Sequence, residues 1–273
     1  MEISAGNLWR LIVFASVFII MMFLELIIPH REGKHSRRKR WPGNILILIS
    51  GNIALRLIPF LLPYSIALWA ESEGWMLSGV GSVPPWLKVL ITILILDLWI
   101  YIQHILLHFV PVLRNLHRMH HTDTHMDLTT ALRFHPLEII FSTLYKAVIV
   151  ALLGLPSLGI LIFEILLNGS AMFNHGNIEI PFKVDKFLRL VIVTPDYHRI
   201  HHSRESSERN SNYGFFLSIW DKLFSTYTAE PQEDRKTFAL GFPGYKESKI
   251  HRLDQLLIDP FRPLLKVIKD RKK

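Results

Sequence analysis

The stretch LWIYIQHILLHFVPVLRNLHRMHHTDTHMDLTTALRFH, residues 98–135, decides the fold, because it holds seven of the chain's fourteen histidines. Their spacing is H-x3-H followed by H-x2-H-H, and the second spacing returns in residues 198–202. Side chains at positions i, i+3 and i+4 project from one face of a helix. A metal ion needs several lone pairs that converge on one point, and helical spacing supplies them. The pattern therefore predicts helices that hold metal.

The candidate metal ligands are the histidines of these clusters and one isolated histidine. They are His104, His108, His117, His120, His121, His175, His198, His201 and His202. One metal ion accepts roughly four to six ligands, so this set predicts two ions. Imidazole suits zinc, copper, iron and nickel, and the spacing alone leaves the metal open.

Four further residues are predicted to be ligands or groups that orient a ligand. They are His135, Glu138, Asn174 and Asp196. His135 could be a tenth ligand or a hydrogen-bonded neighbour of one. Asp196, two residues before His198, could orient an imidazole by accepting its N–H. Asn174 could do the same for the adjacent His175.

The composition favours a membrane protein. Half of the 273 residues are hydrophobic, and the mean hydropathy is +0.27. The absence of cysteine excludes disulfides, iron–sulfur clusters and cysteine-type zinc sites. The formal net charge of +8 is typical, in so apolar a chain, of loops that face an anionic membrane surface. Nucleic acid is not an expected partner.

Long apolar runs predict an all-α, polytopic membrane protein with about four to five transmembrane or re-entrant helices. The runs are residues 8–28, 44–70, 86–110, 136–153 and 158–173. The second contains Pro59 and Pro63, which predict a kink. The third contains Asp97, an acid that is costly at that depth. It should either face a functional partner or form a hydrogen bond between helices. The last two are short, and could be tilted spans or a hairpin that dips and returns.

The orientation follows from residues 30–40, which contain six lysines or arginines. A short basic loop beside a membrane helix belongs on the cytoplasmic side. This rule places all the histidine clusters at the cytoplasmic face, although no histidine was used to set the orientation. We therefore expect a cytoplasmic helical cap that carries a histidine-rich dimetal site.

Six motifs appear in order along the chain: QHILLH, LHRMHH, TTALRFHPLE, FNHGN, TPDYHRIHHS and SNYGFFLSIWDKLFSTY. Together they resemble the fatty acid hydroxylase/sterol desaturase superfamily of integral-membrane di-iron proteins, over roughly half of the chain. The resemblance implies that the nine histidines hold two irons. It also implies that Trp220, Asp221 and Phe224 are packing residues that close the cap on the site. The expected division is residues 1–85 as an N-terminal transmembrane pair with a basic cytoplasmic loop, 86–230 as the catalytic domain, and 231–273 as a basic cytoplasmic tail.

The resemblance implies an O2-dependent oxidoreductase that hydroxylates or desaturates a membrane lipid, such as a sterol or a fatty acyl lipid. The sequence has no dinucleotide fingerprint and no haem module, so electrons must come from an external donor, such as a ferredoxin or a cytochrome with its reductase. The expected location is a bacterial inner membrane, with the endoplasmic reticulum as the alternative, and the metal site is expected on the cytoplasmic side.

Three other functions stay open on the sequence. A non-catalytic lipid-binding or scaffold protein could retain a metal site. A metal transporter would need histidines along a path across the bilayer, whereas residues 71–85 on the outer side have none. A zinc hydrolase is disfavoured because no H-E-x-x-H occurs and no general base can be identified.

Overall fold

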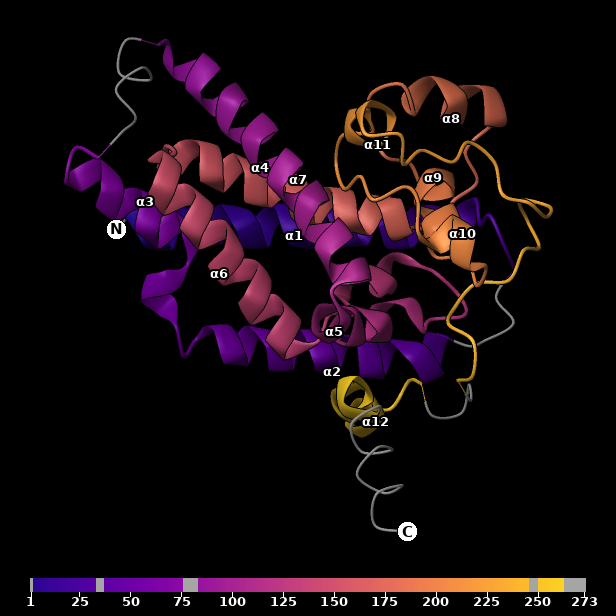
Figure 1. Ribbon diagram of the computed structural model, residues 1–273. Helices are drawn as coiled ribbons and strands as arrows, with labels where there is room; N and C mark the ends of the chain where they lie inside the picture. The colour runs from indigo at the N-terminus through magenta and orange to yellow at the C-terminus, as the bar shows by residue number, and fades with distance from the viewer. Residues whose placement is uncertain (1, 33–36, 76–82, 246–249, 263–273) are drawn as a thin grey trace.

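The computed structural model describes residues 2–32, 37–75, 83–245 and 250–262, and these residues form helices and loops without a β-strand. The predicted tail lies outside the described residues from 263 onward, as does the part of the predicted outer loop at 76–82. Figure 1 shows the short helices α8 to α11 gathered at one end of the longer helices. The elements in order are α1 (Glu2–Ile27), α2 (Arg37–Leu55), η1 (Pro59–Leu61), α3 (Pro63–Ser72), α4 (Pro85–Phe109), α5 (Pro111–His121), η3 (Leu128–Leu132), α6 (Pro136–Leu153), α7 (Ser157–His175), α8 (Phe182–Leu188), α9 (Pro195–His201), α10 (Ser206–Arg209), α11 (Ile219–Leu223), α12 (Leu253–Ile258) and η4 (Asp259–Phe261).

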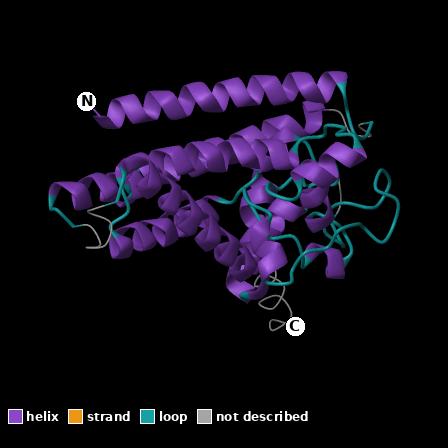
Figure 2. Cartoon of the chain, turned by 90° about the horizontal axis from the view of Figure 1, so that it is seen from above, coloured by secondary structure: helices purple, strands orange, loops and turns teal. Residues whose placement is uncertain are grey.

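Four helices in the described part of the chain are long and apolar enough to cross a membrane. They are α1 over Leu8–Ile27, α4, α6 and α7. Helix α1 runs along one edge of the molecule (Figure 2) and turns Leu11, Ile19 and Phe23 outward. Apolar side chains on the outside are costly in water and suited to lipid. The predicted all-α, multi-pass membrane fold is confirmed.

The apolar run 44–70 was expected to form one kinked helix, but the structure divides it into separate helices. Helix α2 ends at Leu55, and α3 begins at Pro63 after the short η1. Proline lacks the amide hydrogen that an interior helical turn requires, and it is well tolerated at the start of a helix. Pro59 and Pro63 accordingly begin η1 and α3. Neither α2 nor α3 is among the four spanning helices.

The last two apolar runs form two separate helices. Gly154 ends α6 in the left-handed conformation, with φ of 58° and ψ of 44°, which glycine adopts without steric cost. Farther along, α7 approaches α4 closely at Gly159, where an added Cβ would lie 2.7 Å from the Cβ of Thr92. This close approach helps to build an apolar core shared by α3, α4, α6 and α7, which includes Leu96, Val150 and Phe163.

Asp97 joins the membrane part of the fold to the cap. Its carboxylate accepts hydrogen bonds from the indole of Trp220 at 2.8 Å and from the backbone N–H of Leu217 at 3.1 Å. Nearby, the carboxylate of Asp221 accepts from the backbone N–H of Tyr213 at 2.8 Å. The expected partner of Asp97 is therefore the cap, and Trp220 and Asp221 have the packing roles that the resemblance implied.

Replacing Asp97 with alanine should loosen the cap without removing a metal ligand. The indole of Trp220 and the amide of Leu217 would lose their acceptor, and each buried donor left unsatisfied costs about 1–3 kcal/mol. We expect a lower melting temperature in detergent and faster proteolysis within residues 211–227. Asp97→Asn keeps one acceptor oxygen and should lose clearly less. Equal melting temperatures for Asp97→Ala and the native protein would contradict this role.

Candidate metal centre

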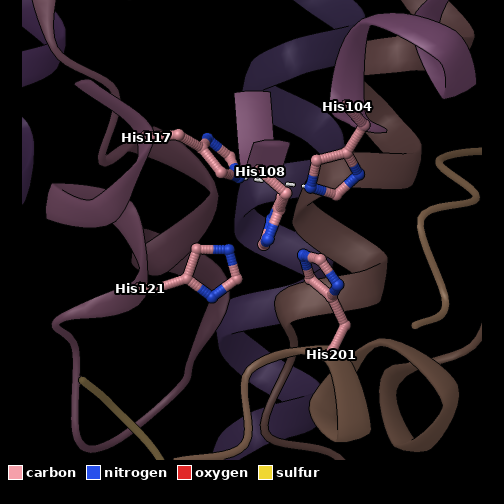
Figure 3. Close-up of side chains that lie close together, drawn as sticks. All are labelled: His104, His108, His117, His121 and His201. Carbon is pink, nitrogen blue, oxygen red and sulfur yellow. Dashed lines mark hydrogen bonds between the residues drawn. The ribbon is translucent and has the colours of Figure 1, made fainter. Parts of the chain in front are cut away.

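All nine candidate histidines are buried, and the structure brings them into two adjacent groups. Within each group, one nitrogen from every ring lies within 4.8 Å of the others. In Figure 3 the five rings of the first group face a common centre. The first group is His104, His108, His117, His121 and His201, and the second is His120, His175, His198 and His202.

The repeated H-x2-H-H spacing has a simple geometric consequence. On α5, His117 and His121 are one turn apart and enter the first group, while His120 enters the second. At the end of α9, His198 and His202 enter the second group and His201 the first. Each cluster therefore contributes to both groups.

The rings of the first group are oriented to bind a cation. Nδ1 of His104 donates to the carbonyl oxygen of Tyr213 at 2.8 Å, and Nδ1 of His117 donates to Oε1 of Glu138 at 2.6 Å. In a neutral imidazole with its proton on Nδ1, Nε2 carries a lone pair. The two Nε2 atoms lie only 3.2 Å apart. Two lone pairs at that distance repel unless a cation lies between them, so these residues fit a metal ion.

Two more rings are fixed in the same way. Nδ1 of His175 donates to the carbonyl oxygen of Ala171, and Nδ1 of His201 donates to that of Ser211, each at 2.7 Å. Metal-binding histidines commonly donate their other N–H to a carbonyl or carboxylate, which sets the tautomer and the ring orientation. The orientation of these rings therefore does not depend on the metal.

Burial keeps five of the rings in the neutral form that binds metals. Desolvation is the main cause that lowers their pKa values, and repulsion by neighbouring imidazoles lowers them further. Together they hold the pKa values of five rings well below the usual range for histidine. These rings are His120, His121, His198, His201 and His202.

Comparison with known proteins gives a match to the fatty acid hydroxylase family model over residues 89–226, about half of the chain. The chain belongs to the fatty acid hydroxylase family. Its curated relatives include the ornithine lipid hydroxylase OlsE of Rhizobium tropici, which is 26% identical over 82% of this chain and 69% of the relative. Alkylglycerol monooxygenase of Homo sapiens is 30% identical over 79% of this chain and 47% of the relative. Cholesterol 25-hydroxylase of Rattus norvegicus is 26% identical over 64% of this chain and 59% of the relative.

The chain therefore spans less than half the length of the human alkylglycerol monooxygenase that it matches. No solved structure matches it. The family match contains all nine candidate histidines, which occupy positions 104 to 202 of the chain.

Of the four further candidates, Glu138 lies beside the site and His135 does not. Glu138 belongs to neither histidine group, but its carboxylate accepts a hydrogen bond from Nδ1 of His117 and so orients that ring. His135 caps α6, because its Nδ1 accepts from the backbone N–H of Leu137 at 3.2 Å, and its Nε2 faces the carbonyl oxygen of Leu257. The structure places His135 outside both histidine groups.

Asn174 and Asp196 have other partners than the imidazoles expected for them. The amide of Asn174 donates to the carbonyl oxygen of Phe215 at 2.5 Å. The carboxylate of Asp196 forms ion pairs with Arg199 and Arg235. Asp196 also lies 3.6 Å from an imidazole, but this ring belongs to His30, which is outside the two groups. Proximity in sequence was a poor guide here, because both side chains turn away from the neighbouring histidine.

Sequence reasoning missed the backbone carbonyls that orient the rings and the role of Tyr213. The ring of Tyr213 packs edge-on against His104 and His108, with centroids 5.6 and 5.2 Å away. No hydrogen-bond partner of its buried hydroxyl is found in the part of the chain that the structure describes. Every residue has a backbone carbonyl, so the sequence does not reveal which carbonyls accept hydrogen bonds. Only the motif that contains Tyr213 could have drawn attention to this residue.

A cavity of about 420 Å³ runs from the histidines into the helical bundle. Its near end is lined by both histidine groups, including His104, His117, His120 and His198. Its walls are largely apolar side chains from α1, α2, α3, α4, α6 and α7. They include Leu48, Leu55, Ile100, Leu107, Ile139 and Leu167. A volume and lining of this kind suit a small or elongated apolar ligand.

Proposed function

We propose that this chain is a di-iron, O2-dependent oxidoreductase that hydroxylates or desaturates a lipid held in the cavity. The observation that carries the proposal is the pair of buried histidine groups at the end of an apolar cavity among membrane helices. The relatives are named for lipid hydroxylation or monooxygenation, which favours hydroxylation over desaturation. A scaffold function would not require two oriented ligand sets beside a cavity.

The two histidine groups would each hold one iron. The five-histidine group leaves little room for further ligands, whereas the four-histidine group leaves more. Bound iron supplies the redox chemistry with O2 that breaks an unactivated C–H bond. We propose the nine histidines as its ligands, with His135 excluded.

The protein's own residues would prepare the site and position the lipid. Glu138 and the carbonyl oxygens around the site hold the rings so that their Nε2 atoms point inward. The apolar walls would exclude bulk water and align the acyl chain or ring system. The carbon that reacts would lie at the near end of the cavity, beside His104, His117 and His120.

The orientation and the electron source are also proposals. The basic residues at the start of α2 lie at the same end as the cap, which supports a cytoplasmic site. The family domain has no cofactor-binding motif for a reductant, so we propose an external ferredoxin or cytochrome with its reductase. The similarity to the Rhizobium tropici hydroxylase supports a bacterial inner membrane.

The test is the metal content of the detergent-purified protein produced with isotopically labelled iron. We expect about two irons per chain by elemental analysis and a Mössbauer signal typical of a magnetically coupled pair. Histidine variants from either group should lower the metal content. Substoichiometric metal that these variants leave unchanged would count against the di-iron assignment and favour a scaffold function.

A further inference from the structure

The far end of the cavity contains charged side chains within the membrane part of the fold. Arg10 comes from α1, Lys146 from α6 and Glu164 from α7, and all three line the same cavity as the histidines. Charged residues at such depth are expensive and usually face a functional cavity. The metal site does not account for them, because none of the three belongs to either histidine group.

Two of these charges already neutralise each other. Nη2 of Arg10 lies 2.6 Å from Oε2 of Glu164, and the guanidinium lies 4.6 Å from the centroid of the Tyr64 ring. This arrangement holds α1 against α3 and α7. Lys146 lies in the field of both charges, but no ion pair or hydrogen bond joins its ammonium to another described residue. The three side chains together carry one net positive charge.

The charged end and the histidine end of the cavity lie about 12–16 Å apart along the helices. Eight residues of α6 separate Glu138, beside the metal site, from Lys146, which is about 12 Å at 1.5 Å per residue. Eleven residues of α7 separate Glu164 from His175, which is about 16 Å. The cavity is therefore elongated, with an oxidation site at one end and a cation at the other.

We propose that Lys146 binds the anionic group of an amphipathic lipid and thereby selects which carbon reaches the histidines. This inference rests on the proposed function for the oxidation itself. An anionic group is favoured over a cationic one because Glu164 is already paired, and the charge left over is positive. A neutral lipid would leave the half-buried ammonium of Lys146 facing an apolar ligand without an ion-pair partner, which is costly. The substrate class is thus a lipid whose carboxylate or phosphate lies roughly 12–16 Å from the carbon that is oxidised.

The proposal can be tested by binding alone, in metal-free protein in neutral detergent. The probes are cis-parinaric acid, an intrinsically fluorescent fatty acid, and its methyl ester, followed by energy transfer from tryptophan. We expect the native protein to prefer the acid over the ester. Lys146→Met should reduce this preference about tenfold, which corresponds to roughly 1.4 kcal/mol. Lys146→Arg should retain it, because the positive charge remains.

Two further variants separate charge recognition from loss of folding. Glu164→Gln raises the net positive charge at the far end and should increase the preference for the acid. Leu144→Met, on the exposed side of α6, should leave it unchanged. Equal affinity of the native protein for acid and ester, or an unchanged preference in Lys146→Met, would overturn the proposal. Since the assay uses neither iron nor O2, a failed iron measurement with intact charge-dependent binding would reject only the proposed oxidation.

Discussion

Replacing His201 with alanine should abolish lipid oxidation and remove iron, while the protein still inserts into the membrane. His201 belongs to the five-histidine group, and its ring is held by the carbonyl oxygen of Ser211. Loss of residues that merely orient a ligand typically costs about 10–100-fold in metal affinity or activity. We expect loss of a ligand to cost more than about a hundredfold in activity. His120→Ala should do the same through the four-histidine group.

The measurements are product formation with a reductant, iron content per chain, and recovery in the membrane fraction. The matched control is His135→Asn, since His135 is also buried but lies outside both groups. Asparagine is among the best residues at a helix N-terminal cap, so α6 should keep its start. We expect this variant to retain both irons. Full activity in His201→Ala, or iron loss in His135→Asn, would show that the ligand assignment is wrong.

The nine candidate ligands could be identified from the sequence, and two metal ions expected from their number, because clustering on a helix depends on local spacing. Positions i, i+3 and i+4 are neighbours on any helix, whatever it packs against. The division of the histidines into two groups was not predicted, because it depends on how the helices that carry them pack together. Proline begins two helices near the site, since Pro111 and Pro195 are the first residues of α5 and α9. The membrane helices followed from run length and hydropathy.

The contacts that orient the site could not be predicted, because they join distant segments. Asp196 was expected to face a ligand imidazole, yet its strongest partners are Arg199 and Arg235. Arg10 is a charge within the apolar run 8–28, and nothing in the sequence indicates its pairing with Glu164. Side-chain direction depends on packing between elements, and single-sequence patterns carry little information about it.

The division of residues 44–70 shows a related limit. Proline predicted a disturbance at 59 and 63, and the disturbance is present. Whether a helix kinks and continues or stops and restarts depends on what satisfies the freed backbone groups. Leu55 ends α2, and the chain passes through η1 before α3. The result is that Leu55, Leu62 and Pro63 line the cavity, so this break shapes its wall.

A second large effect, a loss of stability, is expected when a buried ion-pair network between α2 and the segment after His121 is disrupted. Arg40 of α2 donates from Nε and Nη2 to the two carboxylate oxygens of Asp123, at 3.0 and 2.7 Å. Its Nη1 donates to Asp127 at 2.6 Å. All three residues are buried, and they join α2 to the segment that follows His121. A bidentate arginine–carboxylate contact is strong and geometrically specific.

Arg40→Met should destabilise the protein by about 3–5 kcal/mol, because it leaves a buried carboxylate without its counter-charge. Asp127 would lose one hydrogen bond from Arg40 and keep donors from the indole of Trp41 and the amide of Thr129. Asp123 would lose two and keep the hydroxyl of Thr130 and the amide of His125. The larger cost should therefore fall on Asp123. The free energy of unfolding in mixed micelles measures it. Arg38→Met, at an exposed position on the same turn of α2, is the matched control and should change little.

The decisive variant combines Arg40→Met with Asp123→Asn. If the loss comes from an uncompensated buried charge, removing that charge should restore much of the stability, although a second native group has been replaced. If the loss came only from packing of the arginine side chain, the double variant would be at least as unstable as Arg40→Met. Recovery of stability in the double variant therefore assigns the effect to charge. It would also show that the segment after the central histidine cluster is held in place by electrostatic contacts from α2, independently of any metal.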